Sequence, residues 1–412
     1  EEARNWIACA KHEAAVRDKH RLPGAVAGPG VARTQLHNKY KIGRRQFKRK
    51  LHLKGVKDPK GVLHDDPSRV DQILWESRQA LWCSVPDMPR TANDLLDLYM
   101  GDRHADLPRA PSPGIDLVAS AILSAGNSAP GADGWPYEVY HFGVNFTAAL
   151  LAQAFYLAQE SSDLVQALGP NHDLLLWIPK KGDVLHTDGR RPLQLPTCLR
   201  RLFGSALMRM VGPTVEPELS HDQAAKQGGT CGDNMTRVVR HLSGETECCD
   251  LHSADDSQAV WDTVFGGLAD DMRTLCEPPE DTPEHVLHGN AVLLADQSKA
   301  FERIGYAWLS AVMEKWKFPG WARTSFEALV MDRSVRSATD SATGGARRLL
   351  RGIGMGGPAS PFLWSLAFDP IIVLLGRAVP SPVRTYVDDL SALLRGLAAS
   401  LQAQILLIAL AH

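Results

Sequence analysis

Carboxylates at the ends of apolar segments are the residues in this chain best suited to chemistry. Asp388 and Asp389 stand together between two short, β-prone runs, and Asp296 ends another apolar run that begins at residue 290. The first pattern predicts a strand, a tight turn that carries both aspartates, and a returning strand. Asp-Asp pairs also begin at residues 65, 255 and 270. The hypothesis of a site therefore depends on the second apolar run, which ends in Asp296.

Acids on two neighbouring strands suit phosphoryl transfer assisted by two metal ions. Such ions lie about 3.5–4 Å apart and activate the attacking and leaving oxygens. Mg²⁺ takes hard oxygen ligands, which carboxylates supply. One acid cannot hold two ions, whereas an acid on one strand together with an acidic turn on its neighbour can do so.

A basic loop follows a predicted buried strand at residues 174–178. Lys180, Lys181, Arg190 and Arg191 flank this loop, which spans residues 182–189. Mobile cations on a hairpin can reach a triphosphate. An exposed hairpin tip without a ligand shows the same pattern, and the spacing leaves both interpretations open.

A glycine-rich segment at residues 351–361 lies between the two acidic strands. Its four glycines allow the backbone to approach another surface closely. Ser360 followed by Pro361 is typical of a helix start. The glycines could serve packing alone, but the position of the segment between the two acidic strands favours a role in which it faces the substrate.

Charge is unevenly distributed over the 412 residues, although the net charge is only −2. Residues 1–60 are rich in lysine and arginine, and residues 245–284 are rich in acids. A basic arm on a nearly neutral body suggests a polyanionic partner, and a solvated tail is the alternative. The acidic stretch is predicted to be a surface insertion.

The seven cysteines form no C-x-x-C pair and no cysteine–histidine ladder. This usage predicts a reduced, intracellular protein of the cytoplasm or nucleus, without a zinc site or a disulfide framework. No targeting signal is seen at the start of the sequence, which begins with Glu1 rather than methionine.

Helical periodicity predicts the elements that would position these residues. Apolar residues recur at helical spacing around residues 70–82, 95–100, 137–155 and 199–210. Arg200, Arg201 and Arg209 are expected off the core, either along a nucleic-acid backbone or as ordinary exposed charge. The apolar tail at residues 390–411 could span a membrane, but its polar interruptions favour a strand followed by a helix, with no membrane partner.

Five groups of residues, in order along the chain, resemble motifs of the reverse transcriptase domain of non-LTR (LINE-type) retrotransposons. They are residues 130–134, similar to P-G-P-D-G; residues 178–182 and 191–193, similar to I-P-K-x-G and R-P-I/L; Asp296 with Ala300 and Phe301, similar to D-x-x-x-A-F-D; residues 351–361, similar to R-G-x-x-Q-G-x-P-L-S-P; and residues 386–389, similar to Y-x-D-D. The likeness covers about residues 55–395, and five motifs in register are far more specific than one.

The resemblance implies an α+β protein with the right-hand polymerase architecture of fingers and palm. The antiparallel palm sheet would have packed helices, and the thumb is expected to be absent or truncated. The expected regions are a basic, mostly irregular arm (1–60), a helical segment and linker before the domain (61–114), fingers with part of the palm (115–242), an acidic insertion (243–288) and the palm with the catalytic carboxylates (289–412).

The resemblance also implies an RNA-directed DNA polymerase that adds deoxynucleotides to a primer 3′-hydroxyl. Its partners would be an RNA template, a DNA primer and deoxynucleoside triphosphates, with no oligomeric state assigned. Asp296, Asp388 and Asp389 would be the catalytic residues and would hold two Mg²⁺ ions, with Mn²⁺ as a substitute. The residues implied to contact the nucleotide are Lys180, Lys181, Arg191, Phe301, Met355, Gly356 and Tyr386.

Departures from the family pattern leave other functions open. Met355 stands where the family has glutamine, and Glu302 replaces the second palm aspartate. Only 23 residues follow Asp389, which suggests a fragment of a retrotransposon polyprotein without thumb or endonuclease. One alternative is a non-catalytic nucleic-acid-binding relic. Another is a different palm enzyme, such as an RNA-templated RNA polymerase or a nucleotide cyclase, against which the bulky ring of Phe301 argues.

Overall fold

The structure of this protein is a computed structural model that describes most of the chain between residues 55 and 395. The basic arm up to residue 54, most of the acidic stretch, Lys181 and Asp388 lie outside the described residues. The described residues are 55–88, 91–101, 111–126, 128–158, 172–180, 183–223, 236, 238–240, 243, 259, 262–263, 290–331, 333–338, 345–378, 383–386 and 389–395.

Helices and strands alternate irregularly along the described chain, as expected for a mixed α and β protein. In order, the elements are β1 (Val56–Lys57), β2 (Leu63–His64), α3 (Pro67–Trp82), α4 (Ala92–Met100), α5 (Ile115–Ser124), α6 (Tyr137–Phe142), α7 (Val144–Leu157), β3 (His172–Pro179), η2 (Thr187–Gly189), β4 (Arg190–Leu195), α9 (Cys198–Val215), η3 (Glu216–Glu218), β5 (Asn290–Asp296), α14 (Ala300–Arg303), α15 (Tyr306–Lys315), α16 (Gly320–Val330), β6 (Ser334–Ser337), β7 (Arg347–Arg348), α17 (Ser360–Ala378), β8 (Val383–Tyr386) and β9 (Asp389–Arg395).

A four-stranded sheet has the order β4-β3-β6-β7, in which β3 is antiparallel to β4 and parallel to β6. Burial alternates along β3, with Leu175 and Trp177 on the buried face, which is the period of a half-buried strand. These side chains join a small apolar cluster with residues of α3, including Leu74 and Trp82. Strand β6 pairs antiparallel with β7.

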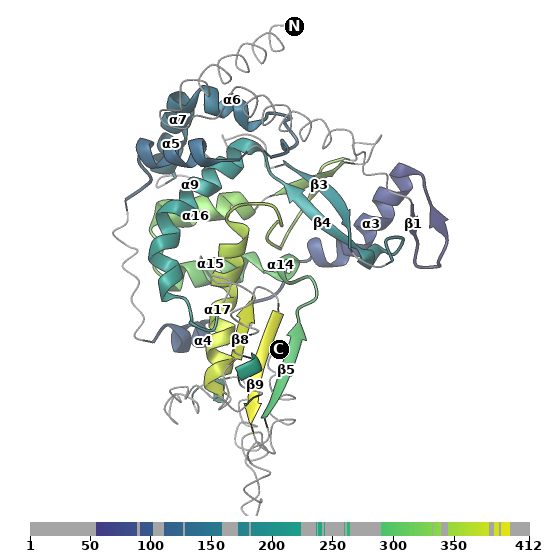
Figure 1. The fold of residues 1–412 in the computed structure, drawn as a ribbon, viewed down its shortest axis with the longest axis vertical. Coiled ribbons are helices and arrows are strands. Elements are labelled where there is room, and N and C mark those ends of the chain that lie inside the picture. The colour runs from purple at the N-terminus through teal and green to yellow at the C-terminus, as the bar shows by residue number, and fades with distance from the viewer. Residues whose placement is uncertain are drawn as a thin grey trace, which may run out of the picture.

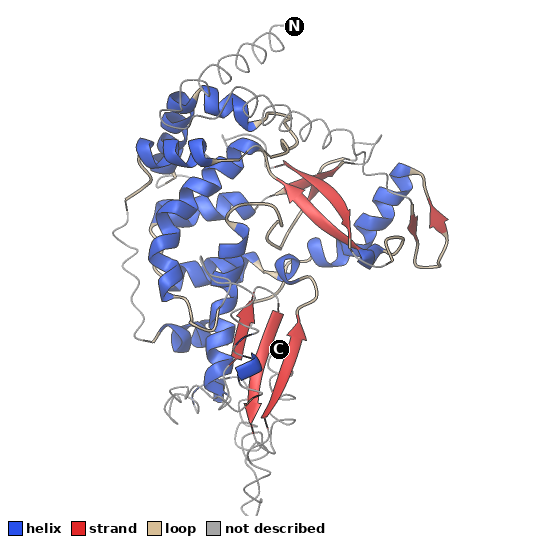
Figure 2. Ribbon diagram, viewed as in Figure 1, coloured by secondary structure: helices blue, strands red, loops and turns tan. Residues whose placement is uncertain are grey.

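A three-stranded sheet has the order β5-β9-β8, with both pairs antiparallel. The predicted strand and returning strand around the Asp-Asp pair are therefore confirmed, while residues 387 and 388 between them lie outside the described residues. One detail of the prediction was wrong: Asp389 is the first residue of β9 and not part of the turn. Ladder pairing with β5 continues through Asp389. In the sequence, only residues 387 and 388 therefore separate β8 from β9. Figures 1 and 2 show this sheet apart from the four-stranded sheet, with α14 between them.

Most helices share one large apolar core with β8 and β9. Helix α17 runs through it, and its Asp369, which is fully buried, accepts hydrogen bonds from the Tyr99 hydroxyl (2.7 Å) and the Ser220 N–H (2.8 Å). Among the described residues, α17 is the one helix long and apolar enough to cross a membrane, yet 78% of its apolar stretch is buried inside the protein. It therefore serves as a core helix here.

Candidate active site

Asp296 and Asp389 lie directly opposite each other on neighbouring strands. Asp296 ends β5, Asp389 begins β9, and the antiparallel register pairs the two residues. Opposite residues in such a pair point to the same face, with Cβ atoms about 4.5–5.5 Å apart. Both residues are exposed. Because like charges placed opposite each other are destabilising, this end of the sheet suits a cation.

The third predicted carboxylate, Asp388, lies between β8 and β9 in the sequence. Tyr386 pairs with Asp389, so Asp388 belongs to the two-residue connection and lies outside the described residues, as does the side chain of Tyr386. In the part of the chain that the structure describes, no group of three or more His, Cys, Asp or Glu could hold a metal ion. The two described donors are carboxylates, the ligand type that Mg²⁺ and Mn²⁺ prefer, so the residue types fit the predicted ions.

The turn that follows Asp296 at the end of β5 leads to Phe301. Lys299 has a left-handed backbone (φ 60°) and is followed by the short helix α14. Phe301 is half-buried, and its ring lies 5.9 Å from that of Trp364 in α17. Its carbonyl accepts a hydrogen bond from the Ile353 N–H (2.8 Å). Phe301 is therefore fixed by the core on one side while part of it remains accessible to a ligand.

The glycine-rich loop at residues 351–359 joins this turn to the four-stranded sheet. Besides the bond from Ile353 to Phe301, the Met355 carbonyl accepts from the Gln194 N–H of β4 (2.9 Å). Gly356 has a φ of 126°, and a Cβ there would overlap the Gln194 carbonyl oxygen. The predicted close backbone approach is thus confirmed, and its partner is β4. Met355 is half-buried and Gly356 is exposed; their contact with a nucleotide stays a prediction.

A buried arginine fixes the same loop. Arg333 donates to the Gly352 carbonyl (2.7 Å) and to Gln194 Oε1 (2.8 Å), and its Nη1 lies 3.4 Å from Asp173 Oδ2. Burial raises the pKa of Asp173, and the charges of Arg333 and Arg200 oppose that shift. One guanidinium therefore connects β3, β4 and the glycine loop.

The basic hairpin β3–β4 presents two of its predicted cations. Lys180 and Arg191 are exposed near the loop end of the hairpin. Arg190 is not available, because it is buried and donates to the Gly55 carbonyl (2.9 Å). Burial raises the pKa of Glu302 on α14, and the charge of Lys180 is among those that oppose the shift. The hairpin end is therefore within electrostatic range of the turn that carries Phe301.

Two arginines predicted off the core are buried instead. Arg200 donates to the Ala328 carbonyl, and burial lowers its pKa to about 10. Arg201 donates to Ser128 Oγ (2.7 Å) and lies over the ring of Tyr137, 5.0 Å from its centroid. Neither a nucleic-acid contact nor ordinary exposed charge describes them. Both sit in the first turn of α9, and their guanidinium groups donate to partners in other segments of the chain.

Sequence reasoning missed the polar residues that join the elements of the site. The sequence identified Glu302 only as a replacement for the second palm aspartate, yet it is buried and accepts a hydrogen bond from Trp82 Nε1 (2.7 Å). Arg78, on α3, lies 3.6 Å from Glu302. A signal for Arg78 existed, because it falls four residues after Leu74 and four before Trp82, on the buried stripe of the helix. No local signal identifies Glu302 as its partner.

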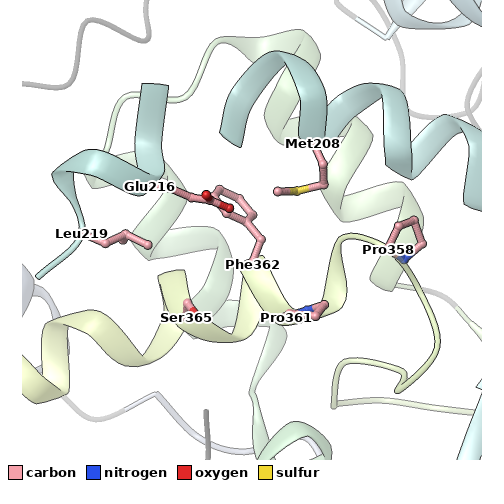
Figure 3. A pocket seen from close by; sticks show the side chains of 7 residues that line it. All are labelled: Met208, Glu216, Leu219, Pro358, Pro361, Phe362 and Ser365. Carbon is pink, nitrogen blue, oxygen red and sulfur yellow. The ribbon is translucent and has the colours of Figure 1, made fainter. Parts of the chain in front are cut away.

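A pocket of about 100 Å³ lies between α9 and the start of α17, and Figure 3 shows Met208 and Phe362 pointing into it. None of the predicted site residues lines it. Its lining consists of Met208, Glu216, Leu219, Pro358, Pro361, Phe362 and Ser365. The predicted nucleotide site is therefore not this pocket.

No model of a known protein family matches the chain, and no curated protein sequence matches it.

Proposed function

We propose that this chain is an RNA-directed DNA polymerase of the two-metal type, in which the three-stranded sheet is the palm and the β3–β4 hairpin belongs to the fingers. The observation that carries the proposal is the register of Asp296 with Asp389, beside a third carboxylate at Asp388. The glycine loop and the basic hairpin adjoin the same turn, which supports a substrate that is both negatively charged and extended.

Each carboxylate has a role in this proposal. Asp296, Asp388 and Asp389 hold two Mg²⁺ ions, which when bound supply charge stabilisation for transfer of a nucleotidyl group to a primer 3′-hydroxyl. The ordered ladder of β5, β9 and β8 fixes the spacing of the two strand-borne acids. Mn²⁺ suits the same oxygen donors and would substitute.

The remaining predicted residues bind and orient the nucleotide. Lys180, Lys181 and Arg191 neutralise the triphosphate, since mobile cations on a hairpin suit phosphate oxygens. In this proposal the bulky ring of Phe301 excludes a ribose 2′-hydroxyl. Backbone and side-chain groups of Met355, Gly356 and Tyr386 line the base and sugar. RNA template and DNA primer bind through their phosphates, so their affinity falls as salt rises.

The test is Mg²⁺-dependent incorporation of deoxynucleotides on a primed RNA template. We expect incorporation by the native chain and a fall of about 10³-fold or more in Asp389→Asn and Asp388→Ala, because a metal ligand is lost. Asp94→Asn, which removes an exposed carboxylate on α4, should keep native activity. Bound RNA without any incorporation would instead favour a non-catalytic nucleic-acid-binding relic, and incorporation of ribonucleotides would favour an RNA-templated RNA polymerase.

A further inference from the structure

Helix α3 contacts both halves of the candidate site, which are the β3–β4 hairpin and the turn after β5. The helix precedes, in the sequence, the five motifs that resemble those of reverse transcriptases. It packs against β1 and η2 at the hairpin and against α14 after β5 (Figure 1). Its apolar face joins Trp177 of β3 in one cluster. The helix is therefore placed to act on the geometry between the two halves.

Trp82, the last residue of α3, contacts three other elements or segments of the site. Its ring stacks on Trp177 of β3, with centroids 5.9 Å apart and planes at 22°. Its indole Nε1 donates to Glu302 Oε2 of α14 (2.7 Å), and its carbonyl accepts from the Leu350 N–H (2.8 Å), just before the glycine loop. Trp82 is only 1% exposed. One side chain thus fastens the hairpin strand to the turn after β5.

Arg78 makes a second connection, one turn earlier on α3. Its Nη1 donates to Asp188 Oδ1 of η2 (3.2 Å), and its Nε lies 3.6 Å from Glu302 Oε2. Asp188 also lies 4.0 Å from Lys299 Nζ. Because Arg78 and Glu302 are both buried, their attraction is weakly screened, whereas Asp188 is largely exposed. The connection again runs between the hairpin end and the turn after β5.

The partners of α3 are sequence neighbours of the predicted nucleotide contacts. Trp177 and Asp188 flank the hairpin end that carries Lys180 and Arg191. On the other side, Glu302 directly follows Phe301. A shift of α3 would therefore change the separation between the triphosphate cations and the sugar-contacting turn.

We propose that α3 sets the separation of the two halves of the nucleotide site, with Trp82, Arg78 and Glu302 as its positioning residues. The inference rests on the proposed polymerase function, in which Lys180 and Arg191 grip the triphosphate. The hairpin has an independent backbone attachment at Gln194 and Met355. Loss of one α3 contact is therefore expected to shift the hairpin end without unfolding the sheet.

The sharpest variant is Trp82→Phe, which keeps an aromatic ring against Trp177 and removes the N–H that Glu302 accepts. Its matched control is Trp308→Phe on α15, which removes an indole hydrogen bond of 2.8 Å to the Ala367 carbonyl. Both variants lose one indole hydrogen bond, but only the first lies between the two halves of the site. Melting temperature should fall in both, so stability alone does not distinguish them.

The decisive measurements are steady-state kinetics for a deoxynucleotide and hydrogen–deuterium exchange of the backbone. For Trp82→Phe we expect KM for the nucleotide to rise about tenfold, the size expected for one lost hydrogen bond to a charged group, with primer–template affinity unchanged. Backbone exchange should accelerate at residues 183–195. Trp308→Phe should keep the native KM within about twofold and show native exchange in this segment.

The outcomes separate this inference from the function on which it rests. An unchanged KM in Trp82→Phe, or equal changes in both variants, would overturn the positioning role. If the native chain incorporates no nucleotide, the polymerase proposal fails. The exchange measurement alone then tests whether α3 couples the hairpin to the turn after β5. Native exchange at residues 183–195 in Trp82→Phe would then reject the coupling by α3, and faster exchange confined to that variant would support it.

Discussion

Glu302 shows how burial and neighbouring charge act on a single carboxyl group in this protein. Burial raises its pKa above the ordinary value of 4.5, and the charge of Arg78 and the hydrogen bond from Trp82 oppose the shift. Since the shift remains upward, folding favours the protonated acid over the ionised one. The contribution of Glu302 to stability is therefore complete below about pH 4.5 and is lost as pH rises through its folded-state pKa.

Glu302→Gln tests this directly, because glutamine has no proton to lose. We expect the free energy of unfolding of the native chain to fall relative to that of the variant as pH rises from 4.5 toward 8. Urea unfolding at several pH values measures the difference. Glu314→Gln, at an exposed position, is the control. A difference between native chain and Glu302→Gln that is the same at every pH contradicts the prediction.

Phe301 offers a second prediction for one side chain. Replacing it by valine removes the ring that the proposal places against the sugar, while Trp364 and the core remain. We expect the preference for deoxynucleotides over ribonucleotides, as the ratio of kcat/KM values, to fall by about tenfold. Phe318→Val, in the same core but away from the site, should keep the native ratio. An unaltered preference in Phe301→Val would assign the ring to packing alone.

Among the elements, the glycine loop is the one whose backbone is most tightly specified. Gly356→Ala should lower the free energy of unfolding by about 1–3 kcal/mol, because φ is positive and the added Cβ meets the Gln194 carbonyl. Gly376→Ala in α17 is the matched control, with no atom near its added Cβ, and should be neutral or stabilising by about 1 kcal/mol. Chemical denaturation measures both, and equal losses would argue against a strained loop.

Sequence periodicity predicted the elements well where one face is buried. The apolar run at residues 174–178 identified β3, and the helical stripe at residues 199–210 identified α9. The acidic hairpin was also predicted, with an error of one residue at Asp389. Burial of Arg200 and Arg201 was not predicted, because charge on a helix is normally exposed. Their partners at Ala328, Ser128 and the Tyr137 ring come from other segments of the chain.

Over the whole molecule, the connections that join elements are buried polar groups, and these were the least predictable. Arg333 with Asp173, and Trp82 with Glu302, link residues far apart in the sequence. No local pattern of residue types specifies such a pair. The opposition of Asp296 and Asp389 was foreseen in outline, since both acids adjoin β-prone runs, but the pairing of their two strands follows only from the structure.

The bond between Tyr99 and Asp369 tests how such a connection contributes to the stability of the whole molecule. It ties α4 to the middle of α17 inside the core. Tyr99→Phe should lower the free energy of unfolding by about 1.5–3 kcal/mol, because a buried carboxylate loses a donor. Tyr156→Phe, at an exposed position on α7, should change it by less than about 0.5 kcal/mol. Similar values for the two variants would refute the prediction.

The pairing of β5 with β9 also determines when the site forms. All of α14, α15, α16 and α17 lies between these strands in the sequence. Closing so long a loop carries an entropic cost that contacts between near neighbours avoid, so such pairings form late. A refolding chain would bury Trp316, Trp321 and Trp364 in the helical core while Asp296 and Asp389 are still apart. Activity is therefore expected to return more slowly than native tryptophan fluorescence.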